Sequence, residues 1–489
     1  MNPAKRHGIT GGTLFTIAMR WTDRLIGLVS TLILARLLMP ADFGIIAMAT
    51  LVIALADVLL DLGVNIALVR DRNTTQAHFD TAWTLRLIQT TASTALIIIL
   101  APYAAEYFGD TRVTPVLQLL AFSMLLAGFE NIGIVAFHKQ MQFGAEFRFL
   151  FLRRIFGFIL TIGAAWSLQN YWALVIGMLG SRAFGVVLSY RMHPMRPRLS
   201  LAKLRELFAV SQWMLIRGLG EFLHNNIHRF IVGRWNNSSV MGAYTIANEI
   251  STMPSAELIA PMNRALLPAL ADTRDTPAER EQLFLLSLGL QALIALPASV
   301  GLALVAPLAV PILLGEPWRD TIPLLQILAL TGIAHSLTSS SQYLLIVLGR
   351  LAQASFIIWA QVAVFIILAI TLIPGAHAEQ IALLRLGVTA LSITLTAWTI
   401  RQYAGIGLLG VVRTTYRPIL ATICLAGILI SIDVPPVAPP LALLLQIFIG
   451  AVAYTCTILV LWIVRQRPAG AEAWLINKLA GFLKRRQQN

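Results

Sequence analysis

Residues 33–69 read ILARLLMPADFGIIAMATLVIALADVLLDLGVNIALV, and this stretch decides the fold class. The part from Phe43 onward is an apolar run in which Asp57 and Asp61 are the only charges. A helix needs about 20 apolar residues to cross roughly 30 Å of hydrocarbon, and this run exceeds that length. The turn signal MPADFG separates the run from an earlier apolar segment, so we expect two consecutive membrane-spanning helices.

The same pattern continues along the whole chain. Of its 489 residues, 57% are hydrophobic and 12% are charged, which is too apolar for a soluble domain. Fourteen apolar windows predict an all-α integral membrane protein with short loops and no room for a soluble catalytic domain. The windows are 12–38, 43–69, 83–106, 113–137, 149–167, 171–190, 208–233, 240–263, 283–310, 321–348, 352–373, 380–400, 417–432 and 441–464.

The distribution of lysine and arginine predicts how the spans are oriented. Of the 37 basic residues, 26 fall in loops on one side and three, Arg112, Arg234 and Arg319, in loops on the other. Loops rich in lysine and arginine stay in the cytoplasm, so we expect a multi-pass membrane protein with both termini cytoplasmic. Topology thus accounts for the net charge of +14, and binding to nucleic acid is not expected.

The other eight basic residues are arginines inside predicted spans. A charge near the bilayer centre is costly, and such residues usually face a cavity or a charged partner. The group therefore indicates a membrane protein that handles something anionic. It consists of Arg20, Arg24, Arg36, Arg86, Arg182, Arg217, Arg229 and Arg385.

A weak internal repeat relates two parts of the chain at an offset of 198 residues. Without gaps, Arg36 and Gly44 fall on Arg234 and Gly242. In both copies a span with polar residues ends in an arginine, and a short outer turn leads to a glycine-bearing span. Spans one and seven have the same predicted orientation, so we expect two parallel six-span bundles with the substrate site between them.

Spans one and seven each carry polar residues at helical spacing, which places each set on one face. The sets are Arg20 and Arg24 in the first span, and Arg217, Glu221, His224, His228 and Arg229 in the second. At 1.5 Å per residue, the arginines near the middle of each span lie close to the midplane. Two interpretations stay open. The arginines line a cationic cavity, or they form internal ion pairs, with Asp57 or Glu221 as partners.

Acidic residues inside the spans are candidates for coupling transport to protons or sodium. The candidates are Asp57, Asp61, Glu221 and Glu249, and a simple counter-ion role is the alternative for each. The histidine–glutamate spacing in span seven has no second set beside it, so we expect no metal site. No phosphate-binding loop or other cofactor motif is present, and we expect no enzymatic activity.

Two stretches on the predicted cytoplasmic side, 196–208 and 473–486, mix leucine or aromatic residues with lysine and arginine. Both are typical of amphipathic helices that lie on an anionic membrane surface. Ordinary loops that fix topology would have a similar composition, and the sequence does not separate the two interpretations.

The exit from span one, LARLLMPADFG (34–44), resembles the polysaccharide biosynthesis flippases. These are Wzx-type oligosaccharide-lipid exporters of the multidrug/oligosaccharidyl-lipid/polysaccharide superfamily. The resemblance reaches motif level over residues 10–72, is weaker over 196–260, and extends to the whole chain in span count. It implies two pseudo-symmetric six-helix lobes in a V shape around a central cationic cavity, plus two C-terminal helices. The expected parts are an N-lobe (1–195), a cytoplasmic linker (196–207), a C-lobe (208–402), spans thirteen and fourteen (403–466) and a basic cytoplasmic tail (467–489).

The resemblance also implies a function. Such proteins move an undecaprenyl-diphosphate-linked oligosaccharide from the cytoplasmic to the periplasmic leaflet by alternating access, for lipopolysaccharide O-antigen, exopolysaccharide or capsule. Arginine suits a diphosphate because its planar fork binds phosphate oxygens in pairs. We expect contacts from Arg20, Arg24, Arg217 and Arg229, then Arg86 and Arg182, with His224 and His228 beside them. Expected partners are the lipid-linked oligosaccharide, membrane lipids, a polysaccharide polymerase and glycosyltransferases, around a monomeric transport unit.

Two other functions remain possible on the sequence. A multidrug or cation antiporter of the same fold would call for an acidic or aromatic cavity. A non-transporting scaffold of a polysaccharide assembly complex would use the basic cytoplasmic loops to recruit enzymes, and would not need the arginines inside the spans.

Overall fold

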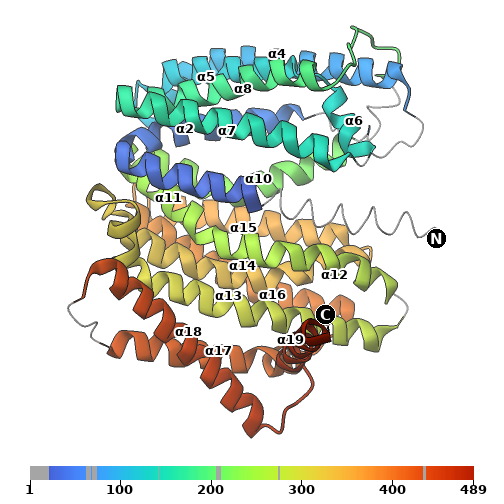
Figure 1. The fold of residues 1–489 in the computed structure, drawn as a ribbon, viewed down its shortest axis with the longest axis vertical. Helices are drawn as coiled ribbons and strands as arrows, with labels where there is room; N and C mark the ends of the chain where they lie inside the picture. The colour runs from blue at the N-terminus through green and yellow to red at the C-terminus, as the bar shows by residue number, and fades with distance from the viewer. Residues whose placement is uncertain are drawn as a thin grey trace. The chain divides into compact units, whose positions relative to one another are not determined.

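The chain is helical throughout the part that the structure describes. The computed structural model (Figure 1) describes residues 21–61, 68, 74–140, 142–204, 211–273, 276–432 and 437–488, and these contain no strand. Ten of the described helices are long and apolar enough to cross a membrane. The predicted fold class, an all-α membrane protein, is confirmed.

Within the described residues, each of the fourteen predicted spans corresponds to a helix or to a continuous helical stretch, except that 113–137 is interrupted at 129–132. The first half contains a helix over 21–37, α2 (Pro40–Leu60), α4 (Gln76–Phe108), α5 (Val113–Gly128) with α6 (Gly133–Lys139), α7 (Phe143–Leu168) and α8 (Trp172–Met192). The second half contains α10 (Ser211–Trp235), α11 (Ser238–Pro254) with η1 (Ser255–Ile259) and α12 (Ala260–Asp272), α13 (Pro277–Leu313), α14 (Thr321–Val347), α15 (Leu351–Leu372) and α16 (Ala378–Ala404). The chain continues with α17 (Leu408–Ser431), α18 (Pro439–Val464) and α19 (Ala471–Gln488).

The chain forms two compact units, Met1–Gly242 and Ala243–Asn489. Within the first unit α4 packs on α5, α7 on α8, and α5 on α8. Within the second unit the corresponding spans make the same pairs, α13 with α14, α15 with α16, and α14 with α16. The recurrence supports the predicted internal repeat. The division at 242 leaves α10 in the first unit, and the finer lobe boundaries remain a prediction.

Of the two stretches predicted to form surface helices, one is helical in the structure and the other is not helical where it is described. Residues 471–488 form α19, as the second pattern predicted. Residues 196–203 are not helical, so the helix predicted over 196–208 is wrong there, and its last residues lie outside the described part. The physical reason is visible in the hydrogen bonds. The backbone N–H groups of Arg198, Ser200 and Lys203 donate to side-chain oxygens of α4 instead of to a helical turn.

Candidate functional site

Asp42 explains why the motif MPADFG begins α2. Pro40 occupies the first turn, where its missing N–H costs nothing. One Asp42 oxygen accepts the N–H of Met39 at 2.9 Å, and the other accepts the N–H of Tyr171, next to the start of α8, at 3.0 Å. A carboxylate is also favoured near the positive end of a helix. Asp42 thus caps α2 and ties it to α8.

Gly44 is required because α2 and the start of α11 touch through their backbones. A Cβ atom on Gly44 would lie 1.8 Å from the carbonyl oxygen of Ser238, and one on Gly242 would lie 1.8 Å from that of Pro40. Each of these Cβ atoms would also lie 3.0 Å from the backbone nitrogen of the other glycine. Small residues permit such close helix contacts in membranes. We call this contact the glycine junction.

The glycine junction joins residues that the repeat had paired. Pro40 corresponds to Ser238, and Gly44 to Gly242, at the same offset of 198 residues. The contacts are reciprocal, because each glycine lies against a backbone carbonyl oxygen of the other segment. The predicted repeat therefore corresponds to a physical contact between its two copies.

Polar and aromatic groups surround the glycine junction within the first unit. Arg112 donates to Asp110 at 2.8 Å and to the hydroxyl of Ser238 at 3.0 Å. The hydrogen bond from Arg112 lowers the pKa of the Asp110 carboxyl. Arg234 lies over the ring of Tyr107 at 5.6 Å. All of these contacts lie at ends of spans that the predicted topology places on the outer side of the membrane.

A second group of charges lies on the helices of the first unit, away from the junction. Arg153 pairs with Glu130, and Arg154 pairs with Asp23, each at 3.4 Å. Arg182 lies within electrostatic range of Arg86, Arg153 and Asp57. We call this group the arginine cluster. It consists of Arg86 on α4, Arg153 and Arg154 on α7 and Arg182 on α8, with the carboxylates of Asp23, Asp57, Asp61 and Glu130.

Glycines make room for the two arginines of α7. The guanidinium of Arg154 lies 2.7 Å from where a Cβ on Gly27 would be, and Arg153 Cδ lies 2.7 Å from the corresponding point on Gly185. A larger side chain at either glycine would displace the arginine. Gly27 and Gly185 thus leave space for the side chains of Arg154 and Arg153.

Arg153 and Arg154 are the residues that the sequence reasoning missed. The charge count assigned them to a cytoplasmic loop, although the predicted span 149–167 contains both, and the structure places them on α7, ten and eleven residues after its first residue. At 1.5 Å per residue this is roughly 15 Å from the start of the helix. The signal was present in the stretch FRFLFLRRIFGF (147–158), where apolar residues continue on both sides of the pair.

The polar face of α10 contains the predicted ion pair. Arg217 Nε donates to Glu221 Oε1 at 2.9 Å, and the two side chains are 41% and 46% exposed. His228 is buried and donates from Nε2 to the carbonyl of Asn225, while Arg229 donates to Asn226. Helix α10 packs against α2 and α4. The internal pair is therefore real, but it is half exposed and does not remove Arg217 from contact with a ligand.

The remaining predicted residues are placed as follows. Arg20 lies outside the described residues, and Arg24 and His224 are partly buried on their helices. Asp61 ends α2. Glu249 lies on α11 in the second unit, where Arg385 of α16 bonds the nearby Asn248. Among the described residues, no three histidine, cysteine or acidic side chains converge on a point that could hold a metal ion.

Comparison with known proteins identifies the family. A family model described as "Polysaccharide biosynthesis protein" matches residues 33–323, which is more than half of the chain. The lipopolysaccharide biosynthesis protein WzxC of Escherichia coli is 24% identical over 64% of this chain. The succinoglycan biosynthesis transport protein ExoT of Rhizobium meliloti is 23% identical, also over 64%. The chain spans 64% of each relative's length, a little under two thirds.

Solved structures show the same fold. The lipid II flippase MurJ in an inward closed conformation superposes with a TM-score of 0.74 at 12% identity, covering 93% of this chain and all of MurJ. An inward-facing multidrug resistance transporter of the MATE family superposes with a TM-score of 0.55 at 15% identity, covering 78% of this chain and 96% of the transporter. The chain belongs to the polysaccharide biosynthesis protein family, a family of multi-pass membrane proteins, and the predicted resemblance is confirmed.

Proposed function

We propose that this member of the polysaccharide biosynthesis protein family moves an undecaprenyl-diphosphate-linked oligosaccharide across the bacterial inner membrane. The cargo passes from the cytoplasmic to the periplasmic leaflet by alternating access, and the chain acts as a transporter and not as an enzyme. The observation that supports this most is the arginine cluster. Its four arginines come from three helices of one unit and have Asp23, Asp57, Asp61 and Glu130 beside them as counter-ions.

The chemistry of the cluster favours an anion over a cation. A diphosphate bears about two negative charges, and a charge-assisted hydrogen bond from arginine to a phosphate oxygen is worth about 1.5–3 kcal/mol. The half-exposed Arg217 of α10 adds a further donor in the same unit. A cation antiporter would call for a predominantly acidic site, and carboxylates do not outnumber arginines among these described residues.

In this proposal, the acidic residues neutralise the arginines again after the cargo leaves. When the cargo leaves, Asp57, Glu130 and Glu221 remain as counter-ions, so no arginine is left alone in a low-dielectric site. Competition between these carboxylates and the diphosphate keeps binding reversible. Asp57, Asp61, Glu221 and Glu249 stay as candidates for ion coupling, and a polymerase and glycosyltransferases as candidate partners.

The test replaces Arg24 and Arg217, singly and together, with alanine and with lysine. We expect the alanine variants to insert normally, to lose surface polysaccharide and to accumulate the lipid-linked precursor in the inner leaflet, while the lysine variants retain part of the activity. Arg401→Ala, an exposed position in the last turn of α16, is the matched control. Normal export by the double alanine variant would contradict the proposal and favour the non-transporting scaffold.

A further inference from the structure

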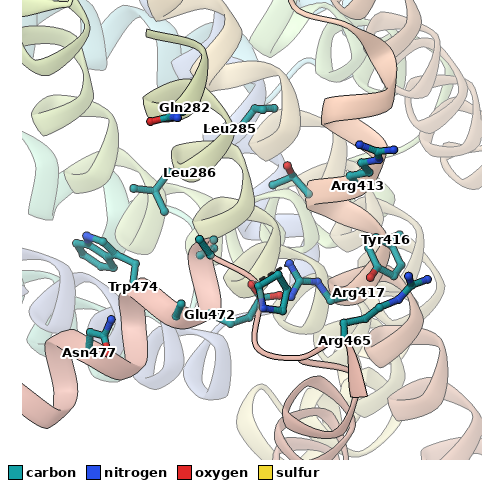
Figure 2. A pocket seen from close by; sticks show the side chains of 16 residues that line it. Gln282, Leu285, Leu286, Arg413, Tyr416, Arg417, Arg465, Glu472, Trp474 and Asn477 are labelled. Atoms are coloured by element: carbon teal, nitrogen blue, oxygen red, sulfur yellow. Dashed lines mark ion pairs between the residues drawn. The ribbon is translucent and has the colours of Figure 1, made fainter. Parts of the chain in front are cut away.

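A pocket of about 1130 Å³ lies in the second unit, apart from the arginine cluster. Figure 2 shows that its walls come from the start of α13, the first half of α17, the turn after α18 and the start of α19. By the predicted topology, every one of these elements lies at the cytoplasmic membrane surface. The pocket is therefore placed where lipid headgroups of the inner leaflet lie.

The lining of the pocket is strongly basic. Arg413 and Arg417 lie one helical turn apart on α17, and Arg465 follows α18, whereas Glu472 is the one carboxylate that lines it. Arg413 and Arg465 are exposed, and within the described chain neither has an ion-pair partner. The pocket thus offers two accessible guanidinium groups at its surface and a third in its wall (Figure 2).

The third guanidinium, that of Arg417, is incompletely satisfied. Arg417 is 6% exposed, and its Nη2 atom lies 3.3 Å from Glu472, which is equally buried. Its Nε and Nη1 atoms are buried and have no hydrogen-bond partner in the described residues. A buried N–H of a charged group without an acceptor is costly. An anion in the pocket, with a small shift of the side chain, would supply the missing acceptor.

Exposed apolar side chains in the lining of the pocket, and next to it in sequence, favour a membrane-borne ligand. Trp474 lines the pocket and is 42% exposed, and Leu475 and Val412, the sequence neighbours of Trp474 and Arg413, are 44% and 57% exposed. Lys478 lies over the ring of Trp474 at 5.6 Å, as expected for a helix with one face in the headgroup layer. A water-soluble anion would gain nothing from these side chains, whereas a lipid buries its chains beside them.

We propose that this pocket binds the phosphate of an anionic lipid headgroup from the inner leaflet. Arg413 and Arg465 contact the phosphate oxygens from the surface of the pocket. Arg417 contacts them from the wall through Nε and Nη1, the two nitrogens that do not pair with Glu472. The bound lipid holds α19 against α13 and α17. This site is separate from the arginine cluster and does not depend on what the protein transports.

The test measures lipid retention by the purified full-length protein, using native mass spectrometry with phosphatidylglycerol and with uncharged diacylglycerol as probes. We expect phosphatidylglycerol to be retained at least tenfold more strongly. Arg465→Glu should remove this preference without unfolding the protein, because Arg465 is exposed, whereas Arg401→Glu, an exposed arginine outside the pocket, should leave it unchanged. If both variants lower the preference equally, the preference comes from the general surface charge of the protein and the proposal is wrong.

Two further measurements separate a site from a structural contact. Glu472→Gln removes the competing carboxylate, so we expect phosphatidylglycerol affinity to rise severalfold, while a purely structural Arg417–Glu472 pair would give no rise. Inorganic pyrophosphate tests for a water-soluble ligand. If it displaces phosphatidylglycerol completely at equal concentration, the pocket is a site for a free phosphate compound, and the lipid proposal is wrong.

Discussion

The glycine junction and the arginine cluster share helix α2 of the first unit, but their residues are packed in opposite ways. On α2, Gly44 belongs to the junction and Asp57 to the cluster, about 20 Å apart along the helix. At the junction, backbone touches backbone and even a methyl group has no space. At the cluster, long charged side chains lie beside carboxylates, and the side chains of Arg154 and Asp23 are 48% and 66% exposed. The junction has no space for a ligand, and we propose that the anion binds at the cluster instead.

Under the proposed alternating access, the two regions have different roles. We propose that the glycine junction, a backbone contact without interlocking side chains, separates when helices tilt. Charged groups in a membrane protein need a partner whenever water or cargo leaves, and we propose that the carboxylates beside the arginines provide it.

The largest effect is expected from Arg153→Ala combined with Arg154→Ala. Loss of two charge-assisted contacts of about 1.5–3 kcal/mol each corresponds to roughly a hundredfold loss of export or more. Polysaccharide export in cells, normalised to the amount of inserted protein, measures it. Arg148→Ala on the same helix, exposed and outside the cluster, is the control. Equal export by the double variant and the control would show that Arg153 and Arg154 do not take part in transport.

A smaller effect is expected from Gly44→Ala. The new Cβ would overlap the carbonyl oxygen of Ser238, which is backbone and cannot rotate away. Overpacking typically costs about 1–3 kcal/mol, so we expect roughly tenfold weaker export, with a shift towards separated helices. The rate of modification of a cysteine introduced at Ser238 reports the separation. Gly163→Ala, which meets nothing within 4 Å, should change neither quantity.

Asp42→Ala should act on stability more than on transport. It removes the hydrogen bonds to the N–H groups of Met39 and Tyr171, and loss of such a cap costs about 1–2 kcal/mol. Thermal unfolding of the purified protein in detergent measures the decrease. Asp320→Ala is the control, since Asp320 begins α14 without a side-chain cap bond. If both variants unfold at the same temperature, Asp42 does not hold α2 to α8.

The smallest effect is a dependence of the junction on pH. The pKa of Asp110 is lowered from 3.8 in the folded protein by the hydrogen bond from Arg112. The stabilisation is therefore fully present above that value and is lost as the pH falls through the folded pKa. Stability measured from pH 5 down to pH 2 should decline less in Asp110→Asn than in the wild type. Parallel curves would show that Asp110 does not contribute.

Much of the fold could be predicted from the sequence, because membrane spans depend on composition and length alone. The fourteen windows and the helix over 473–486 needed no long-range information. The stretch at 196–203 could not be predicted, since its backbone is satisfied by α4 side chains that are distant in sequence.

The site was harder to predict than the fold. The sequence identified Arg86, Arg182 and Arg217 as charges inside spans, but their partners depend on helix packing. An ion pair between Arg24 and Asp57 was one of the two open interpretations, and the pair that the structure shows at this place joins the neighbouring Asp23 to Arg154 of α7. The repeat predicted that Gly44 and Gly242 are equivalent, and only the structure shows that they touch.

The most direct test of the arginine cluster is the rate of translocation in proteoliposomes for a set of lipid-linked sugars that differ in headgroup charge. The carriers are an undecaprenyl diphosphate, a monophosphate and an uncharged polyprenyl sugar, compared for the wild type and for Arg86→Ala combined with Arg182→Ala. We predict that the wild type moves the diphosphate fastest and the uncharged carrier slowest, and that the variant loses this order. If the wild type moves all three carriers at the same rate, the proposal that the arginines bind the diphosphate during transport is contradicted.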